Sequence, residues 1–170
     1  MPTPLLPHLP DGIRALVAPI HPEIVPSMLK AVELIAAQGR PDATVVNDVI
    51  KAVASHRVPI YETASYILGE LATYSPEALQ ALLELSYSTD SRVRHNALLC
   101  ITENMPADDV HDLLGRGLRD KSSRVRRKAA DWAGRLRCRA VLPAIQAALK
   151  VEKNAETRDV MLAEARRLMN

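Results

Sequence analysis

The sequence predicts an all-α protein, a right-handed α-solenoid of about four to five antiparallel helix pairs. Three observations support this prediction: an internal repeat, apolar residues at helical spacing within each copy of it, and very few aromatic residues. Aromatic residues make up 3% of the chain and Phe is absent, so Ala, Leu, Val and Ile must form the core. Such residues favour closely packed helices over a β-sandwich.

The repeat is clearest in the second half of the chain. Val93-Arg94 recurs as Val125-Arg126, and one further period brings Thr157-Arg158. An apolar residue follows each arginine by three positions: Ala97, Ala129 and Met161. Glu62 stands one period before Arg94, so the earliest copy keeps the helical pattern but lacks the arginine. A single helix pair cannot bury its apolar face, whereas stacked pairs can, and this predicts the solenoid.

The spacing of apolar residues predicts two helices in each repeat. First helices are expected near 42–56, 76–87, 107–118 and 140–150, and second helices near 59–74, 90–104, 121–137 and 155–169. Pro59, Pro76 and Pro106 stand where helices can begin, and Ser75 and Asp90 are available as N-caps. No segment has a strand pattern.

The N-terminal end differs in composition from the rest. Seven of the 12 prolines lie between Pro2 and Pro26, so residues 1–23 are predicted to be an irregular, proline-rich lead-in or cap. Residues 24–170 then form one repeat domain, with a first helix near 24–38 and a shorter helical piece near 11–18. No basic region or long apolar run marks a signal peptide or a membrane span. Cys100 and Cys138 are expected to be reduced thiols in a cytoplasmic protein.

The segment DKSSRVRRKAADWAGRL, which begins at Asp120, resembles a HEAT or HEAT-like (phycobilisome-lyase type) repeat. The copy at 90–104 has Ser88 in place of the acid, and the copy with Glu152 and Arg158 has Thr157 in place of valine. The copy at 59–73 lacks both acid and arginine. The resemblance covers residues 42–170 and implies a fold, because such repeats serve many unrelated functions.

The resemblance also implies a structural role for several charged residues. In these repeats the acid of the turn and the arginine after the valine form a hydrogen-bonded ladder along the stack. The resemblance therefore implies that Asp120 pairs with Arg126, that Glu152 pairs with Arg158, and that Arg94 joins the ladder.

Charge is divided unevenly along the chain. Residues 1–115 hold 7 Lys/Arg and 14 Asp/Glu, a net charge of −7, whereas residues 116–170 hold 15 and 6, a net charge of +9. Within the basic part, residues 120–139 carry eight Lys/Arg. This density indicates either a binding surface or simply a solvated helix face.

The helical pattern predicts where the charged side chains point. If Val125, Ala129, Trp132 and Leu136 face the core, the opposite face of that helix is charged and lines the concave side of the solenoid. Neighbouring repeats add an acidic and aromatic end, so the concave groove is expected to be bipolar. The predicted partner-binding residues are Arg92, His95, Arg124, Arg127, Lys128, Asp131, Arg135, Tyr66 and Glu70.

These features predict a non-enzymatic module that grips a protein partner with its concave face. Compact bacterial proteins with such repeats include immunity proteins and adaptors. By analogy, a narrower hypothesis is that this protein is a bacterial immunity protein or adaptor. The alternative is a nucleic-acid-binding protein that uses the basic cluster at 116–139. No membrane, metal or cofactor is expected as a partner.

An enzyme is the least supported reading. Asp131 beside Trp132 resembles the acid and aromatics of HEAT-like alkylpurine DNA glycosylases, but there is no second Trp, and Trp132 fits a core position. A lyase role follows from the repeat name alone. The five histidines are scattered without metal-ligand spacing, and no nucleophile elbow or phosphate loop is present. The sequence therefore predicts no catalytic residues.

Overall fold

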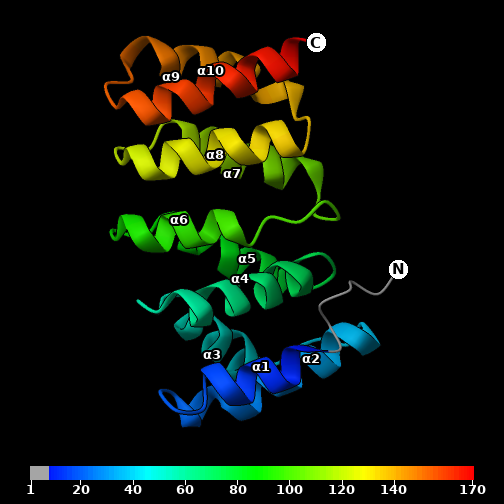
Figure 1. The fold of residues 1–170 in the computed structure, drawn as a ribbon. Helices are drawn as coiled ribbons and strands as arrows, with labels where there is room; N and C mark the ends of the chain where they lie inside the picture. Colours follow the sequence, from blue (N-terminus) through cyan, green and yellow to red (C-terminus); the bar gives the residue numbers. More distant parts are fainter. Residues whose placement is uncertain (1–7) are drawn as a thin grey trace. The chain divides into compact units, whose positions relative to one another are not determined.

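All regular structure in residues 8–170, the part of the chain described by the computed structural model, is helical (Figure 1). The all-α prediction is confirmed for these residues. The chain divides into two compact units between Leu85 and Ser86, and we call them the N-terminal and C-terminal units. The division of the chain into residues 1–23 and 24–170 stays a prediction.

The N-terminal unit is built around one central helix. Its elements are α1 (Leu9–Leu16), the short 3₁₀ helix η2 (Pro22–Ile24), α2 (Val25–Ala37), α3 (Ala43–Val53), α4 (Val58–Ala72) and α5 (Pro76–Leu85). Helix α4 packs against α1, α2, α3 and α5. Beyond its exposed first residue Val58, α4 buries large aliphatic side chains almost fully, among them Ile60, Ile67, Leu68 and Leu71. The core of this unit is therefore aliphatic, as the composition predicts.

The first described residues form two short helices with turns between them. Pro10 lies in the first turn of α1, where proline is tolerated, and Pro22 begins η2. Ile13 and Val17 are fully buried. Helix α1 lies where the sequence predicts a short helical piece near 11–18, and residues 17–20, which include Pro19, form turns before η2. Residues 1–7, the remainder of the predicted lead-in, lie outside the described range.

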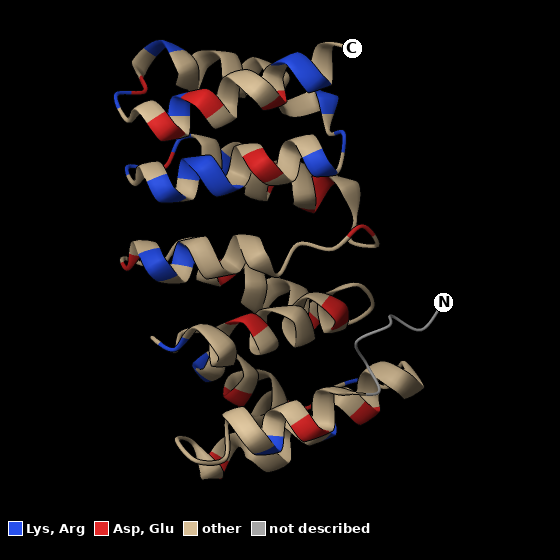
Figure 2. Cartoon of the chain, viewed as in Figure 1, with Lys and Arg blue, Asp and Glu red and all other residues tan. Residues whose placement is uncertain are grey.

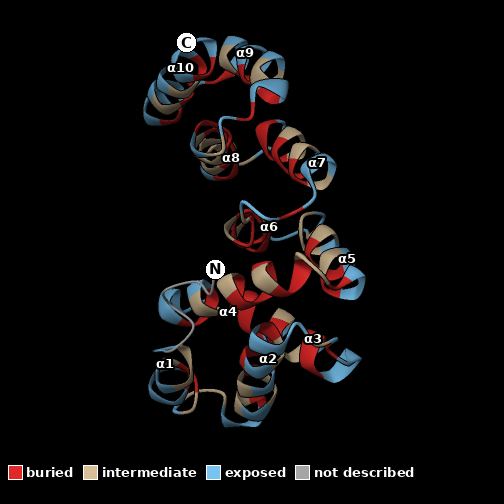
Figure 3. Cartoon of the chain, turned by 90° about the vertical axis from the view of Figure 1, so that its right-hand side faces the viewer, coloured by how far each residue is buried: buried red, intermediate tan, exposed pale blue. Residues whose placement is uncertain are grey.

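The C-terminal unit repeats at regular intervals. Its elements are α6 (Ser91–Leu99), α7 (Ala107–Leu118), α8 (Ser123–Arg135), the 3₁₀ helix η3 (Arg139–Val141), α9 (Leu142–Val151) and α10 (Ala155–Met169). Helices α6, α8 and α10 follow one another in one layer, with α7 and α9 on the other side (Figures 1 and 3). Their N-caps are Asp90, Ser122 and Asn154, spaced evenly as the repeat in the sequence predicts.

Helix α6 is shorter than the predicted helix at 90–104. It ends at Leu99, and the segment from Ile101 to Pro106 is irregular. Ile101 and Met105 are buried within this segment, so apolar contacts hold it without a helix. Pro106 also restricts the backbone of Met105 to an extended conformation, which disfavours a continuing helix.

Helices α7 and α8 pack closely because a glycine lies between them. A Cβ atom on Gly117 would come within 2.8 Å of the Ala129 Cβ and 3.3 Å of a Leu98 methyl group. The buried positions of α7 face α8 (Figure 3). Leu113, Leu114 and Leu118 supply most of the apolar surface there. Glycine at 117 thus sets how near the two layers approach.

Candidate partner-binding face

Two buried ion pairs join successive repeats of the C-terminal unit. The guanidinium of Arg94 donates to both carboxylate oxygens of Asp120, at 2.6 and 2.8 Å. Arg126 donates in the same two-pronged way to Glu152, also at 2.6 and 2.8 Å. Each pair joins residues 26 positions apart. We call these two pairs the ladder.

Each ladder residue also fixes its own turn. Arg94 donates a further hydrogen bond to the Ser88 carbonyl, and Arg126 donates one to the Asp120 carbonyl. The carboxylates accept backbone N–H groups two residues on, from Ser122 to Asp120 and from Asn154 to Glu152. Equivalent bonds thus recur at the period of the sequence. The ladder has the hydrogen-bonded form that the HEAT resemblance implies, and both arginine side chains are engaged in it.

The predicted pairing within each repeat is wrong. The carboxylate of Asp120 binds Arg94 rather than Arg126, and Arg158 donates to the Leu149 carbonyl rather than to Glu152. The reason is geometric: Arg94 and Arg126 each lie in the first turn of their helix and reach across to the turn of the next repeat. Only their main-chain contacts stay within their own repeat.

The surroundings of the ladder favour the charged forms of both carboxylates. Burial raises the pKa of Asp120, but hydrogen bonds from Arg94 and the Ser122 N–H outweigh it and hold the pKa below its ordinary value. The hydrogen bond from Arg126 lowers the pKa of Glu152, against the opposing effect of burial. Both acids therefore stay ionised at neutral pH.

Four of the five predicted partner-binding residues of α8 lie around one hollow, and the fifth, Arg135, lines another hollow. The first of these hollows has a volume of about 230 Å³ and is lined by His95, Arg124, Arg127, Lys128, Asp131 and Val160. Basic positions gather along α8, with one acidic position, Asp131, among them (Figure 2). We call the residues Arg124, Arg127, Lys128, Asp131 and Arg135 the α8 face.

Most charges of the α8 face are already paired. Arg127 forms an ion pair with Glu156 of α10. Asp131 accepts from Lys128 at 3.3 Å and from Arg135 at 3.1 Å. Arg124 is exposed and has no hydrogen bond or ion pair with any described residue. The face is therefore a patterned, mixed-charge surface rather than a uniform row of cations.

His95 lies deeper than the sequence predicts. Its side chain is buried, and its Nδ1 is 3.3 Å from the Asn96 amide oxygen. Burial lowers the pKa of His95 to about 4, and the charges of Arg124, Lys128 and Arg127 act in the same direction. His95 is thus a neutral wall of the hollow at physiological pH, not an exposed contact residue as expected.

Arg92 is also less accessible than expected. It pairs with the N-cap Asp90 at 2.7 Å, and its side chain is 21% exposed. One of its guanidinium nitrogens, Nη1, is buried and donates to no described group. Arg92 therefore closes the first turn of α6 and contributes little open surface.

Tyr66 and Glu70 belong to the N-terminal unit, on α4. Both are half-buried, while Tyr61 is buried in the core as its repeat position predicts. Burial raises the pKa of Glu70. It also raises the pKa of Tyr74, one turn further along, to about 12, with a contribution from the Glu70 charge. These groups form an acidic and aromatic stretch of the N-terminal unit.

Trp132 is half-buried rather than a core residue. Its indole Nε1 is buried and donates to no described group, and the guanidinium of Arg135 lies 5.7 Å from its ring centre. The core positions of α8 are instead small residues, among them Val125, Ala129, Ala130 and Ala133. Trp132 covers their edge, and Asp131 beside it is engaged by Lys128 and Arg135, as described above.

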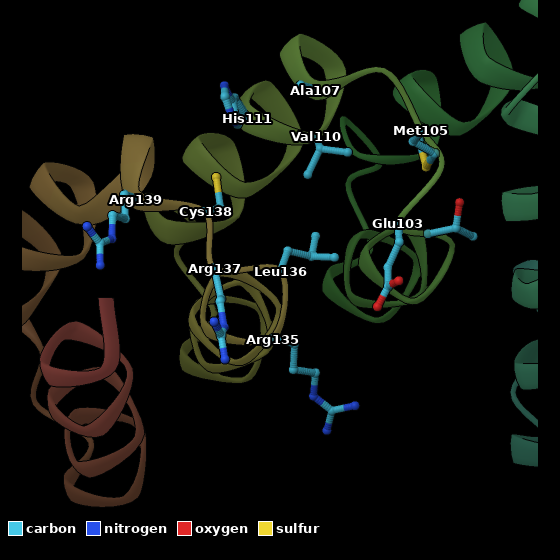
Figure 4. A pocket seen from close by; sticks show the side chains of 11 residues that line it. Glu103, Met105, Ala107, Val110, His111, Arg135, Leu136, Arg137, Cys138 and Arg139 are labelled. Atoms are coloured by element: carbon cyan, nitrogen blue, oxygen red, sulfur yellow. The ribbon is translucent and has the colours of Figure 1, made fainter. Parts of the chain in front are cut away.

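A second, larger hollow is lined by the predicted Arg135 and by residues that the sequence reasoning missed, among them Arg137 and Arg139. It has a volume of about 490 Å³, and its lining also includes His111 and Cys138 (Figure 4). The signal for it was visible as the run RLRCR after α8. That run falls outside the helical pattern, so face assignment along α8 could not place it.

Other kinds of site find no support in the described residues. No group of three or more His, Cys, Asp or Glu side chains is placed to hold a metal ion within residues 8–170. Cys100 and Cys138 are buried and not disulfide-bonded. No helix in this range is long and apolar enough to cross a bilayer.

No protein-family model matches the chain, and no curated protein does. Among solved structures, the chain is similar to the crystal structure of an engineered protein determined by a structural genomics consortium, at 18% identity and a TM-score of 0.44. That match covers 96% of this chain and 79% of the engineered one.

Proposed function

We propose that the chain is a HEAT-like α-solenoid module, right-handed, that binds a protein partner and has no catalytic activity of its own. The proposal of repeats is supported by the regular spacing of equivalent residues along the chain. The N-caps Asp90, Ser122 and Asn154 are evenly spaced, and the two ladder pairs recur at the same spacing. Equivalent hydrogen bonds at equal spacing are what stacked repeats require, because each repeat contacts chiefly its neighbours. The narrower readings, an immunity protein or an adaptor in bacteria, rest on resemblance.

The α8 face carries the proposal of a protein partner. It holds four basic side chains and one acid, Asp131, and together Asp131 and Glu156 of α10 already engage Arg127, Lys128 and Arg135. A nucleic-acid backbone needs several cations free to neutralise phosphates. A protein surface of mixed charge matches such a pattern group by group, and complementarity of this kind chiefly sets specificity and association rate.

The hypothesis of nucleic-acid binding is weakened because arginines of the cluster at 116–139 are already engaged within the protein. Arg126 is committed to the ladder, and Arg116 pairs with Asp112 while its guanidinium lies 3.9 Å from the ring centre of Tyr87. Arg124 is the clearest available cation of the α8 face. Within the α8 face, this single cation without a described partner supports at most a weak electrostatic attraction to a duplex. Arg137 and Arg139 of the same cluster, which also lack a described partner, lie beyond the end of α8.

The test reverses charge on the α8 face without disturbing the fold. Arg124→Glu is the cleanest change, because Arg124 has no described partner to lose. Reversing Arg127 or Lys128 instead sets like charges against Glu156 or Asp131 and lowers stability as well. We expect wild-type protein used as bait in its native cell to retain a specific protein partner, and Arg124→Glu to retain markedly less of it.

A matched control separates the face from net charge. Lys150→Glu changes the charge equally on exposed α9, so we expect it to retain the partner as wild type does. Fluorescence anisotropy with duplex and single-stranded DNA and RNA tests the other reading. Submicromolar, salt-sensitive nucleic-acid binding near physiological ionic strength, weakened by Arg124→Glu but not by Lys150→Glu, would overturn the proposal.

A further inference from the structure

The last turn of α8 ends in a backbone conformation that arginine rarely adopts. Arg137 has a φ of 50°, in the left-handed region. The Arg137 N–H donates to the Gly134 carbonyl at 3.2 Å, and the Cys138 N–H donates to the Ala133 carbonyl at 2.9 Å. Glycine usually occupies this position after a helix, because it has no Cβ. Arginine here keeps a guanidinium at the end of α8 despite the strain.

Three guanidinium groups line one hollow beside this turn. Arg137, Arg139 and Arg167 line it together with Leu168 and Asn170, and its volume is about 230 Å³. No acidic side chain belongs to this lining. The side chains of Arg137 and Arg139 have no hydrogen bond or ion pair with a described residue, and Arg167 lies 3.7 Å from Glu164.

The carboxyl ends of the neighbouring helices do not fully neutralise the positive charge of the three arginines. The carboxyl ends of α8 and α10 lie at the hollow, and each contributes roughly half a negative charge. Together with the Glu164 carboxylate this offsets roughly two of the three positive charges. An excess of positive charge remains for an anion.

The neighbouring hollow of about 490 Å³ shares Arg137 and Arg139 in its lining. Its other walls include the apolar side chains of Met105, Val110 and Leu136 (Figure 4). A ligand whose anionic group meets the arginines thus has apolar surface next to it. Guanidinium groups bind phosphate oxygens in pairs, with geometric selectivity and strong charge-assisted hydrogen bonds.

From these observations we infer that Arg137, Arg139 and Arg167 form a binding site for the phosphate group of a small organic phosphate, with its apolar part toward Met105 and Leu136. This site adjoins the α8 face at Arg135, which lines the larger hollow, but it does not depend on the proposed function. A carboxylate shares part of this chemistry, but carries one charge where a phosphate monoester carries nearly two at neutral pH.

The experiment is an NMR titration of the full chain with phenyl phosphate, inorganic phosphate and benzoate. We expect phenyl phosphate to shift the amide resonances of residues 137–139 and 167–170 and to bind about tenfold more tightly than benzoate, because it carries more charge. We expect inorganic phosphate to shift the same resonances more weakly, since it lacks the apolar part.

Arg137→Gly separates ligand binding from a structural role. It removes the guanidinium and also relieves the left-handed backbone, so the unliganded protein should melt no lower than wild type while its affinity for phenyl phosphate falls at least about tenfold. Gln38→Gly is the matched control. Gln38 has the same φ of 50° after α2. Gln38→Gly should therefore also melt no lower than wild type, but it should keep full affinity for phenyl phosphate.

Two further variants keep the test decisive if Arg137→Gly is unstable. Arg139→Ala and Arg167→Ala should each weaken phenyl phosphate binding, whereas Lys121→Ala, an exposed cation before the start of α8, should not. The inference fails if wild-type protein shows no shifts localised to these residues, if Lys121→Ala weakens binding as much as the arginine changes do, or if benzoate binds as tightly as phenyl phosphate.

Discussion

The two units of the chain hold their helices together in different ways. In the C-terminal unit, buried ion pairs connect successive repeats, with side-chain exposures of 10% and 9% for Arg94 and Asp120 and of 17% and 0% for Arg126 and Glu152. The described N-terminal residues contain no buried ion pair of this kind. Their longest-range pair, Arg40 with Glu77, is 72% and 55% exposed. In the N-terminal unit, the helices are held together chiefly by packing against the aliphatic side chains of α4.

This difference shows what the ladder adds to apolar packing. Apolar burial is non-directional and tolerates small shifts between helices. The ladder is directional, since each carboxylate accepts both a guanidinium and a backbone N–H of its own turn. We infer that the ladder fixes the register between repeats of the C-terminal unit, whereas apolar packing, with a Ser27–Asp48 hydrogen bond of 2.6 Å between α2 and α3, holds the N-terminal unit.

Breaking the ladder should give the largest effect. Glu152→Gln leaves the Arg126 guanidinium buried without a counter-charge, which we expect to lower the free energy of unfolding by about 3 kcal/mol. Urea denaturation followed by circular dichroism measures this change. The control is Arg40→Gln in the N-terminal unit, where loss of the exposed pair should change stability by less than about 0.5 kcal/mol. Equal losses in both variants would remove the distinction between the units.

Acid should weaken the C-terminal unit by about 1–3 kcal/mol between pH 7 and pH 4. His95 has its pKa lowered to about 4 when folded, against an ordinary value of 6.5. The unfolded chain therefore binds the proton first, and stability is full above pH 6.5 and falls as the pH drops toward 4. The lowered pKa values of Asp120 and Glu152 extend the loss below their ordinary values of 3.8 and 4.5.

The N-terminal unit should respond less to acid. The pKa of Glu70 is raised, so protonation favours the folded state there, while the lowered pKa of Asp48 acts in the opposite direction. Hydrogen exchange measured peptide by peptide across this pH range separates the two units. His95→Gln should abolish the part of the slope between pH 6.5 and 4. A wild-type slope in that variant would assign the effect to other groups.

The smallest expected changes in stability come from replacing two glycines by alanine. The two changes have opposite signs in the two units. Gly117→Ala brings its Cβ to 2.8 Å from Ala129, so we expect it to destabilise by about 1–2 kcal/mol through overpacking. Gly12 lies inside α1, and its Cβ would meet nothing within 4 Å. Gly12→Ala should therefore stabilise by about 0.5–1 kcal/mol. Melting curves of the two variants test both signs together.

Local sequence patterns predicted the helices well, for a physical reason. Proline at the starts of α4 and α5, and caps such as Asp90, act over one turn and need no tertiary partner. Helix α6 was predicted too long because Ile101 and Met105 are buried outside a helix, and such burial depends on residues far away in sequence.

The site was predicted less completely because its partners are distant in sequence. The pattern placed Arg124, Arg127 and Lys128 on one face, and the structure brings them around one hollow. It could not show that His95 is buried there or that Arg126 reaches Glu152 in the turn of the next repeat. The partner of each side chain depends on how successive repeats stack. The sequence of a single repeat does not determine this stacking.

The most direct test of this account is a double-mutant cycle on Arg126. If the ladder joins successive repeats, Arg126→Met and Glu152→Gln should couple by about 1–3 kcal/mol in the free energy of unfolding. Arg126→Met and Asp120→Asn should couple much less, because Asp120 meets Arg126 through its main-chain carbonyl, which the substitution leaves in place. Strong coupling of Arg126 to Asp120, with additive effects for Glu152, would contradict the ladder between repeats and restore pairing within each repeat.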